Sequence, residues 1–436
     1  FESTNDSEIV SIHENLRMFF LSVCKNYKGV AMWSHMVKKR DILTNSYHID
    51  DNNFLQSFYN KYIDSISQGN FYQTKYYLTI SIPVADEKNS DGIDQAIDMM
   101  KELNLQVKNI LKIYDVSALK VKKGNMRSEI GGFLGFILNH KNIEIPLSSN
   151  EISKSITNSD MLFGYDAFQL QNSDDNDVIF GTNYNLKDFP RKTEVGHLDF
   201  LLKLPYEFVL TQSFMPMVAT RAIKSIESQM KKMASAKSYA EIDAQELDVG
   251  LQAIQSGDSA IGSYHSVLTV FGRTFEEAVE NGAKVSSEML SSGKGFKYSK
   301  ATYEGVLSYF SHLPMSKHRP LSSQRSVGNF ASLNSFHNFS YGKANGNPIG
   351  DGSALMPLKT NSDSLYYMNT HNSPLNKNVT GQKIAGHALI LGATGTGKTT
   401  LEATASAFLQ RFKPNMFVVD YNRSTEMFVR AYGGVY

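Results

Sequence analysis

The sequence predicts a mixed α/β protein, with an α+β region over most of the chain and a strand–loop–helix–strand unit near its carboxyl end. Apolar residues recur every three or four positions in several segments, which indicates helices. Other segments are short runs of β-branched and aromatic residues, which indicate strands. A chain of 436 residues exceeds what one hydrophobic core usually supports, so at least two domains are expected.

The first part of the chain is expected to alternate between strands and helices. Residues 30–36 and 76–84 have the composition of strands, and residues 51–66 and 96–113 have the spacing of helices. The first of these helices is predicted from Phe54, Leu55, Phe58, Tyr59 and Tyr62. The apolar run 130–138 is too short to span a membrane and is expected to be a buried element.

The same alternation is expected to resume at residue 201. A strand is predicted within 201–214 and another within 259–271, each followed by a helix. The second of these helices begins with Thr274 and Glu277, which have the spacing of a capping box. The helix after Pro216 is predicted to turn one apolar face to the core, formed by Ala219, Ile223, Ile226, Met230 and Met233.

Residues 312–380 form a long stretch without regular spacing, apart from an expected hairpin over 355–368. Long irregular segments of this kind usually connect domains or carry function. We therefore place a domain boundary near residue 380, with an amino-terminal domain over 1–380 and the start of a second domain over 381–436.

Composition and charge constrain function only weakly. The 44 Lys and Arg nearly balance the 43 Asp and Glu, so the net charge of +1 does not indicate a nucleic-acid partner. Local basic clusters at 38–40 and 120–127 are interpreted as solvated faces. The single cysteine, Cys24, excludes an internal disulfide and fits a reducing compartment. No apolar run is long enough to span a bilayer, and both ends of the chain suggest a piece of a longer protein.

One motif in the second domain carries a specific chemical signal. Residues 388–391 are expected to form a buried strand, and residues 392–399, GATGTGKT, fit the pattern G-x-x-x-x-G-K-[ST]. Apolar residues then recur at helical spacing, at Leu401, Ala405, Phe408, Leu409 and Phe412. A strand before this loop and a helix after it form the context in which the pattern binds nucleotide phosphates. The expected fold is therefore the opening of a RecA-like P-loop NTPase domain.

Each part of the loop has an expected role. Its glycines let the backbone wrap closely around phosphate, and the N–H groups at the helix start bind the anion. Lys398 is expected to contact the β- and γ-phosphates of ATP, Thr399 to bind Mg²⁺, and Thr400 to lie near the α-phosphate. The predicted nucleotide-binding residues are Gly392, Ala393, Thr394, Gly395, Thr396, Gly397, Lys398, Thr399 and Thr400.

A second strand is expected at 416–419, ending at Asp420. Ligands of open α/β sheets gather at the carboxyl ends of strands, so Asp420 and Glu426 could bind the metal shell or polarise water. The alternatives are that Asp420 caps a helix and that Glu426 is a solvated helix residue. Arg423 and Arg430 could contact phosphate in a neighbouring subunit.

Other catalytic chemistries have little support. The eleven histidines show no H-E-x-x-H pattern, and the chain has no G-x-S-x-G sequence. His265 lies in an apolar strand and is interpreted as a satisfied core histidine. His337 and Asn338 are interpreted as residues that organise a loop.

Several stretches resemble the energising ATPases of bacterial type IV secretion and conjugation systems, the TrbE/CagE family. They occur in the family's order from about residue 200 onward, whereas earlier residues match only in their general pattern of strands and helices. The matching stretches are LPYEFVLTQSF at 204–214, GNFASLNSFHNF at 328–339, GNPIG at 346–350, GHALILGATGTGKTT at 386–400 and FVRAYGGVY at 428–436.

The resemblance implies a cytoplasmic ATPase, peripheral to the bacterial inner membrane, that uses ATP and Mg²⁺ and assembles as a hexamer. It would dock on inner-membrane components of the secretion system and drive transport of a protein or DNA substrate, or pilus assembly. It also implies that the catalytic acid lies beyond Tyr436, so residues 1–436 alone are expected not to turn over ATP. Two alternatives remain: a docking or scaffold module without activity of its own, and a DNA-pumping ATPase.

Overall fold

The computed structural model describes residues 4–43, 47–49, 52–84, 90–114, 116–122, 124, 126–148, 151–235, 241–360 and 362–436, without the side chains of 90, 233–235 and 241–245. The chain divides into two compact units. Unit 1 comprises residues 1–39 and 74–338, and unit 2 comprises residues 40–73 and 339–436. These units do not coincide with the boundary placed near residue 380, which stays a prediction about independent folding.

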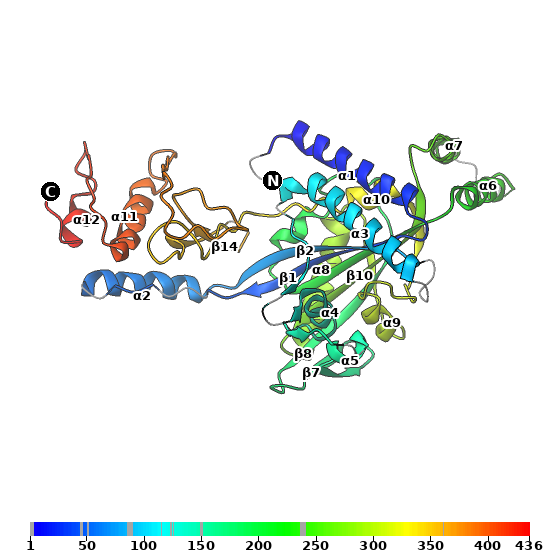
Figure 1. The fold of residues 1–436 in the computed structure, drawn as a ribbon, viewed down its shortest axis with the longest axis horizontal. Coiled ribbons are helices and arrows are strands. Elements are labelled where there is room, and N and C mark those ends of the chain that lie inside the picture. Colours follow the sequence, from blue (N-terminus) through cyan, green and yellow to red (C-terminus); the bar gives the residue numbers. More distant parts are fainter. Residues whose placement is uncertain are drawn as a thin grey trace. The chain divides into compact units, whose positions relative to one another are not determined.

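Unit 1 is built on a nine-stranded sheet, counted over the described residues (Figure 1). Its main path runs β2-β1-β9-β10-β8-β7-β6, with β11 beside β8 and β12 beside β10. The pairs from β1 through β9, β10, β8 and β7 to β6 are antiparallel. In chain order the strands are β1 (Ala31–Asp41), β2 (Phe71–Ser81), β6 (Ser159–Phe163), β7 (Phe168–Asn172), β8 (Val178–Asp188), β9 (Phe208–Pro216), β10 (Ile261–Gly272), β11 (Lys297–Lys300) and β12 (Ser323–Ser326).

Helices cover both faces of this sheet, because successive side chains of a strand point to opposite sides. On the first face, Phe330 of α10 (Val327–Ser332) stacks on Phe214 and contacts Phe20 of α1 (Asp6–Asn26). On the second face, a cluster around Tyr309 joins α9 (Gly305–Phe310) and α4 (Glu129–Asn139) to the strands. The sheet is therefore the middle of three layers.

The remaining described elements of unit 1 are helices and a small sheet at its periphery. Helix α3 lies near α1, and α6 packs with α7. Their bounds are α3 (Ser90–Ile110), α5 (Ile152–Ile156), α6 (Ala219–Ser235), α7 (Glu241–Gln255), the 3-10 turns η1 (Lys112–Tyr114) and η2 (Asp199–Lys203), and the strands β3 (Val121–Lys122), β4 (Arg127–Ser128) and β5 (Ile145–Pro146). No helix among the described residues has both the length and the hydropathy needed to cross a bilayer.

Unit 2 combines an early helix with the carboxyl-terminal part of the chain. Its core contains two clusters, one around Tyr59 and Phe408 and the other around Phe71 and Leu365. The hairpin expected over 355–368 is confirmed as an antiparallel pair of strands. The elements are α2 (Asn53–Ser67), β13 (Met356–Lys359), β14 (Leu365–Met368), α11 (Lys398–Leu409), η3 (Gln410–Phe412) and α12 (Glu426–Ala431).

Most of the helices and strands predicted for the first 271 residues are confirmed, although their first and last residues differ from the prediction. The strands expected at 30–36, 76–84, 201–214 and 259–271 correspond to β1, β2, β9 and β10, and the two early helices correspond to α2 and α3. Helix α1 was not predicted, since its apolar residues are interspersed among polar ones. Asp51, at the predicted helix start, and the side chain of Met233 lie outside the described residues.

The basic cluster 38–40, interpreted as a solvated face, is one only in part: Arg40 is exposed and Lys39 half-buried, but Lys38 is buried. Lys38 is 1% exposed, and its ammonium donates to the carbonyl oxygens of Leu201 (3.3 Å) and Leu202 (2.5 Å). A buried lysine is tolerated when its donors are paired in this way. Lys38 is buried because it lies in β1, opposite Phe208 of the interior strand β9. Its place in the sheet, and not the hydrophilic character of its side chain, decides its exposure.

Helix α8 (Phe275–Ser291) packs closely on the first face because it contains Gly282. A Cβ at this position would lie 2.2 Å from Cγ2 of Thr182 and 2.9 Å from the hydroxyl of Tyr184, both on β8. The helix starts at the predicted cap: the Thr274 side chain accepts from the Glu277 amide at 3.1 Å. The absence of a side chain at Gly282 therefore allows α8 to contact β8 closely, although glycine lowers the intrinsic stability of the helix.

Two glycine substitutions should change stability in opposite directions. Gly282→Ala should lower the free energy of unfolding by about 1–3 kcal/mol, because the added methyl overlaps β8. Gly250→Ala, in the interior of α7, should raise it by about 0.5–1 kcal/mol, because a Cβ there meets no atom within 4 Å. Urea unfolding followed by circular dichroism measures both. Destabilisation by Gly250→Ala equal to that by Gly282→Ala would contradict this account of the α8 contact.

A chain of buried polar groups crosses the second face. The Thr269 hydroxyl donates to Oδ1 of Asn183 at 2.6 Å, so it must accept from Nε2 of His312 at 2.7 Å. Nδ1 of His312 then accepts from the Thr211 hydroxyl at 2.6 Å. His35 donates from Nε2 to the His312 carbonyl oxygen at 2.7 Å. These bonds assign a neutral tautomer to His312.

Burial keeps the histidines of this face uncharged. It lowers the pKa of His35 from 6.5 to about 4, and burial together with Arg319 lowers that of His265 to about 3. The pKa of His312 is lowered by burial and by the two neighbouring histidines. His265 is a core histidine as predicted, but only its Nδ1 has a partner, Ser213, and its Nε2 has none among the described residues.

Stability should therefore fall on mild acidification. An unfolded histidine binds a proton near pH 6.5, whereas in the fold His35 stays neutral until about pH 4. Its stabilising contribution is complete above pH 6.5 and is lost as the pH falls towards 4, a change on the order of 2–3 kcal/mol. Urea midpoints at pH 7.5 and 5.5 should show the decline, and His35→Gln, which cannot titrate, should reduce its slope. Equal slopes in the two proteins would rule out His35 as a source.

Candidate functional site

The loop before α11 has the backbone geometry that its glycines allow. Gly395 and Gly397 have φ angles of +83° and +90°, in the left-handed region where a Cβ would be strained. Gly397 is the cap residue of α11, and no side chain of the described chain caps the helix start. The first amides of the helix are thus available to an external acceptor.

Lys398 is the first residue of α11, and its side chain folds back over the loop. Its ammonium donates to the carbonyl oxygens of Gly392 and Ala393, both at 2.8 Å. The Thr396 hydroxyl also donates to Ala393, at 2.7 Å. A positive charge is therefore held at the mouth of the loop, next to the unpaired amides of the helix start.

This arrangement fits an anionic ligand such as a phosphate. Backbone N–H groups and the positive end of the helix dipole favour negative charge there, and the lysine adds a full charge. Thr399 and Thr400 occupy the first turn, where a hydroxyl can reach a cation bound to the phosphates. The described residues contain no group of three or more His, Cys, Asp or Glu that could hold a metal ion.

The two strands predicted beside the loop do not form. Residues 388–391 and 416–419 have no regular structure, and the side chains of Leu389, Leu391 and Phe417 are 82%, 81% and 92% exposed. Strand propensity alone does not form a strand, which needs a neighbour to pair its N–H and C=O groups. No described segment pairs with either run. The predicted helix, in contrast, is confirmed as α11.

Asp420 organises the turn before α12. Its carboxylate accepts from the amide (2.7 Å) and hydroxyl (2.6 Å) of Thr425, and these bonds lower its pKa to about 2. Glu426 forms an ion pair with Arg430 one turn along α12, at 2.9 Å. Glu426 is a helix residue, as its structural alternative had it. Asp420 does not cap α12, because the cap residue is Thr425 and the helix start has no side-chain cap among the described residues. A role for either in metal binding or water activation stays a prediction.

The buried side of α11 is covered by residues that sequence analysis did not connect with the loop. Ala403, Ala407 and Phe408 are buried, and the cluster around them includes Tyr59 of α2. The aromatic spacing of α2 was visible in the sequence, but only as the apolar stripe of a helix. Nothing in that spacing indicates which distant segment the stripe contacts.

His337 and Asn338 organise a loop of unit 1, as predicted. Nδ1 of His337 lies 2.6 Å from a carboxylate oxygen of Asp199, and the Asn338 amide donates to the Thr74 carbonyl oxygen at 2.9 Å. The Tyr76 hydroxyl donates to the His337 carbonyl oxygen at 2.9 Å. His337 and Asn338 therefore connect the loop to β2 through Thr74 and Tyr76, and to η2 through Asp199.

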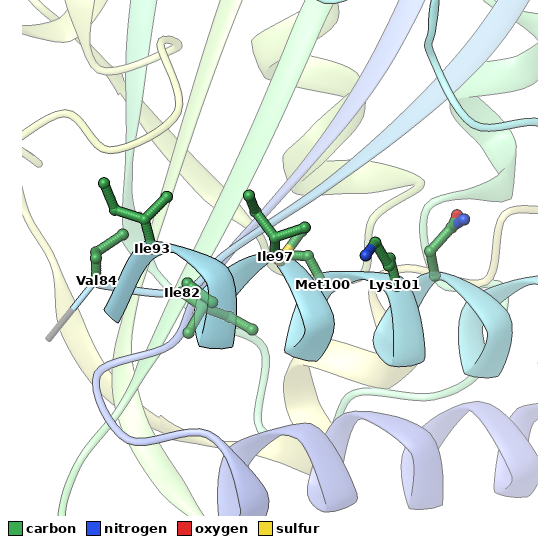
Figure 2. Close-up of a pocket in the computed structure, with 8 residues that line it drawn as sticks. Ile82, Val84, Ile93, Ile97, Met100 and Lys101 are labelled. Carbon is green, nitrogen blue, oxygen red and sulfur yellow. The ribbon is translucent and has the colours of Figure 1, made fainter. Parts of the chain in front are cut away.

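A groove in unit 1 lies between the end of β2 and α3. Figure 2 shows Ile93, Ile97 and Met100 along one side of the helix, with Ile82 and Val84 from the strand end. Its one charged lining residue, Lys101, forms an ion pair with Asp98 at 2.8 Å. The lining offers no acid–base pair and no phosphate ligands, so the groove is an apolar surface feature and not a second catalytic candidate.

Two comparisons with known proteins relate the chain to the same kind of protein, a component of type IV transporter or secretion systems. Residues 115–320, all within unit 1, match the CagE, TrbE, VirB family, described as a component of the type IV transporter system. The type IV secretion system protein virB4 of Bartonella quintana is 27% identical over 462 aligned residues, which cover 100% of this chain and 56% of that protein. The proteins of the same name from Brucella suis and, as protein virB4, from Agrobacterium tumefaciens are 26% and 25% identical over 95% and 93% of the chain. The chain spans about half the length of these curated relatives.

Proposed function

We propose, from the match of residues 115–320 to the CagE, TrbE, VirB family of type IV transporter components, that the full-length protein hydrolyses ATP to energise a secretion system. The observation that carries the proposal is the loop 392–397 with Lys398 at the start of a 12-residue helix. The family match ends at residue 320, so this loop supports the ATPase function independently of it.

The loop residues would act on the nucleotide by position and charge. Lys398 would exchange its two carbonyl partners for β- and γ-phosphate oxygens, and the free amides of the helix start would bind the same anion. Thr399 would share Mg²⁺ with those phosphates, and the metal when bound would neutralise charge that develops on the transferred group. Gly395 and Gly397 have no side chain to block the backbone of the loop, which would let the phosphates approach closely.

The role of a catalytic acid is not assigned to Asp420 or Glu426. Asp420 is engaged with Thr425, and Glu426 with Arg430, so each would have to give up existing bonds to orient water. The position of the catalytic acid therefore stays a prediction.

The wider assembly is proposed on the same basis. The protein would act at the cytoplasmic side of the bacterial inner membrane, assemble as a hexamer, and dock on inner-membrane components of the secretion system. Its substrate would be a secreted protein or DNA. A docking module without activity is the second candidate, favoured by the position of the family match wholly within unit 1. ATP turnover separates the two.

Replacing the loop lysine tests the proposed function. In the full-length protein, Lys398→Ala should lower ATP turnover by about 10²-fold or more, because the charge that stabilises the transferring phosphoryl group is lost. Its unfolding midpoint should stay at the wild-type value, since the side chain contacts only loop carbonyls. Lys383→Ala, which removes an exposed lysine of the same unit, is the matched control. Wild-type turnover by Lys398→Ala would leave the docking module as the better account.

A further inference from the structure

The helix that carries Lys398 is fixed at its far end. The last carbonyls of an α-helix lack partners within the helix, and other groups must satisfy them. The Ala407 carbonyl oxygen accepts from the Gln410 amide and from the Tyr59 hydroxyl, the latter at 2.6 Å. Tyr59 belongs to α2, which precedes α11 by more than 300 residues in the chain. A side chain from the early segment thus caps the end of α11.

The ring of Tyr59 makes a second contact with the same helix turn. It stacks on Phe408 with ring centroids 4.6 Å apart and an angle of 13° between the planes. Tyr59 and Phe408 are both 0% exposed. Burial raises the pKa of Tyr59 to about 12, so its hydroxyl stays a donor at neutral pH. The hydrogen bond fixes α11 along its axis, and the stacked ring fixes its rotation about that axis.

Tyr62, one turn further along α2, gives a natural comparison. Its hydroxyl also donates to a backbone carbonyl, that of Pro357, at 2.7 Å, and its ring meets Phe408 edge-on at 5.3 Å. Burial raises its pKa to about 12 as well. Pro357 lies in the hairpin strand β13, however, and not in α11. The two hydroxyls are therefore alike in bond type and differ in the element that they hold.

We propose that Tyr59 is a positioning residue of the nucleotide site, acting on Lys398 through α11; this inference rests on the proposed function. Ala407 is nine positions after Lys398, so the anchored carbonyl lies roughly 14 Å along the helix from the lysine. A tilt of about 5° at the anchor would shift the loop by about 1 Å over that length. Displacements of this size are enough to lower the rate of a positioned reaction by up to about 100-fold. Tyr59 is thereby part of the site although it lies more than 300 residues before Lys398 in the chain.

The test compares Tyr59→Phe with Tyr62→Phe in the full-length protein. Each variant keeps its ring and loses one hydroxyl bonded to a backbone carbonyl, so both should lose similar stability. Tyr59→Phe should lower kcat/KM for ATP by about three- to ten-fold, whereas Tyr62→Phe should stay within about two-fold of wild type. Without nucleotide, hydrogen exchange of the Leu401 amide, which donates to Gly397 at 2.9 Å, should be faster in Tyr59→Phe alone.

Two results would overturn the positioning role. One is a wild-type kcat/KM and wild-type Leu401 exchange in Tyr59→Phe. The other is an equal loss in both variants at equal unfolding midpoints, which would assign the effect to general stability. Lys398→Ala in the same series separates this inference from the proposed function. If Lys398→Ala turns over ATP normally, the proposed function fails, and if it is inactive while Tyr59→Phe is normal, only the positioning role fails.

Discussion

The antiparallel pairing of β9 with β10 is the interaction on which the larger unit depends. Nine residue pairs join the two strands, from Gly262 opposite Pro216 to Val270 opposite Phe208. Each strand also pairs on its other edge, β9 with β1 and β10 with β8, so both are interior strands. Helices on both faces then exclude water from nearly every residue of the pair. Polar side chains on these strands must find partners inside the protein, and Gln212 does so with the Leu333 carbonyl and the Tyr264 hydroxyl.

The smaller unit is held together differently. The described part of unit 2 has only a two-stranded hairpin, and α11 does not pack on a broad sheet. Aromatic rings supply the cover instead, with Tyr47, Tyr59 and Tyr62 arranged around Phe408. Aromatic pairs bury large areas in defined geometries, so few residues suffice to orient a helix. The loop that offers its amides and Lys398 to an anion is therefore supported mainly from behind, through its own helix.

The sequence predicted local structure well and long-range contacts poorly. Periodicity identified β1, β9, β10 and α2 because each buries one side or both, and burial leaves a pattern in neighbouring residues. The stripe that predicted α3 is only partly buried, since Ile97 and Met100 are exposed. The loop 392–399 was recognised because phosphate binding demands particular residue types at fixed spacing. The runs 388–391 and 416–419 have strand composition but lack a described partner, and pairing is a property of two segments that one segment cannot reveal. The contact of Tyr59 with Ala407 was invisible for the same reason, as was the burial of Lys38.

The smaller unit is discontinuous in the gene. A polypeptide made from residues 339–436 alone would lack α2 and would present the face of Phe408 to water. If unit 2 were exchanged between two related proteins, both of its coding segments, 40–73 and 339–436, would have to be transferred together. Otherwise the transferred α11 would pack against the α2 aromatic residues of a different sequence. Substitutions at position 59 and at positions 407 and 408 should consequently be inherited as a group, despite their separation in the chain.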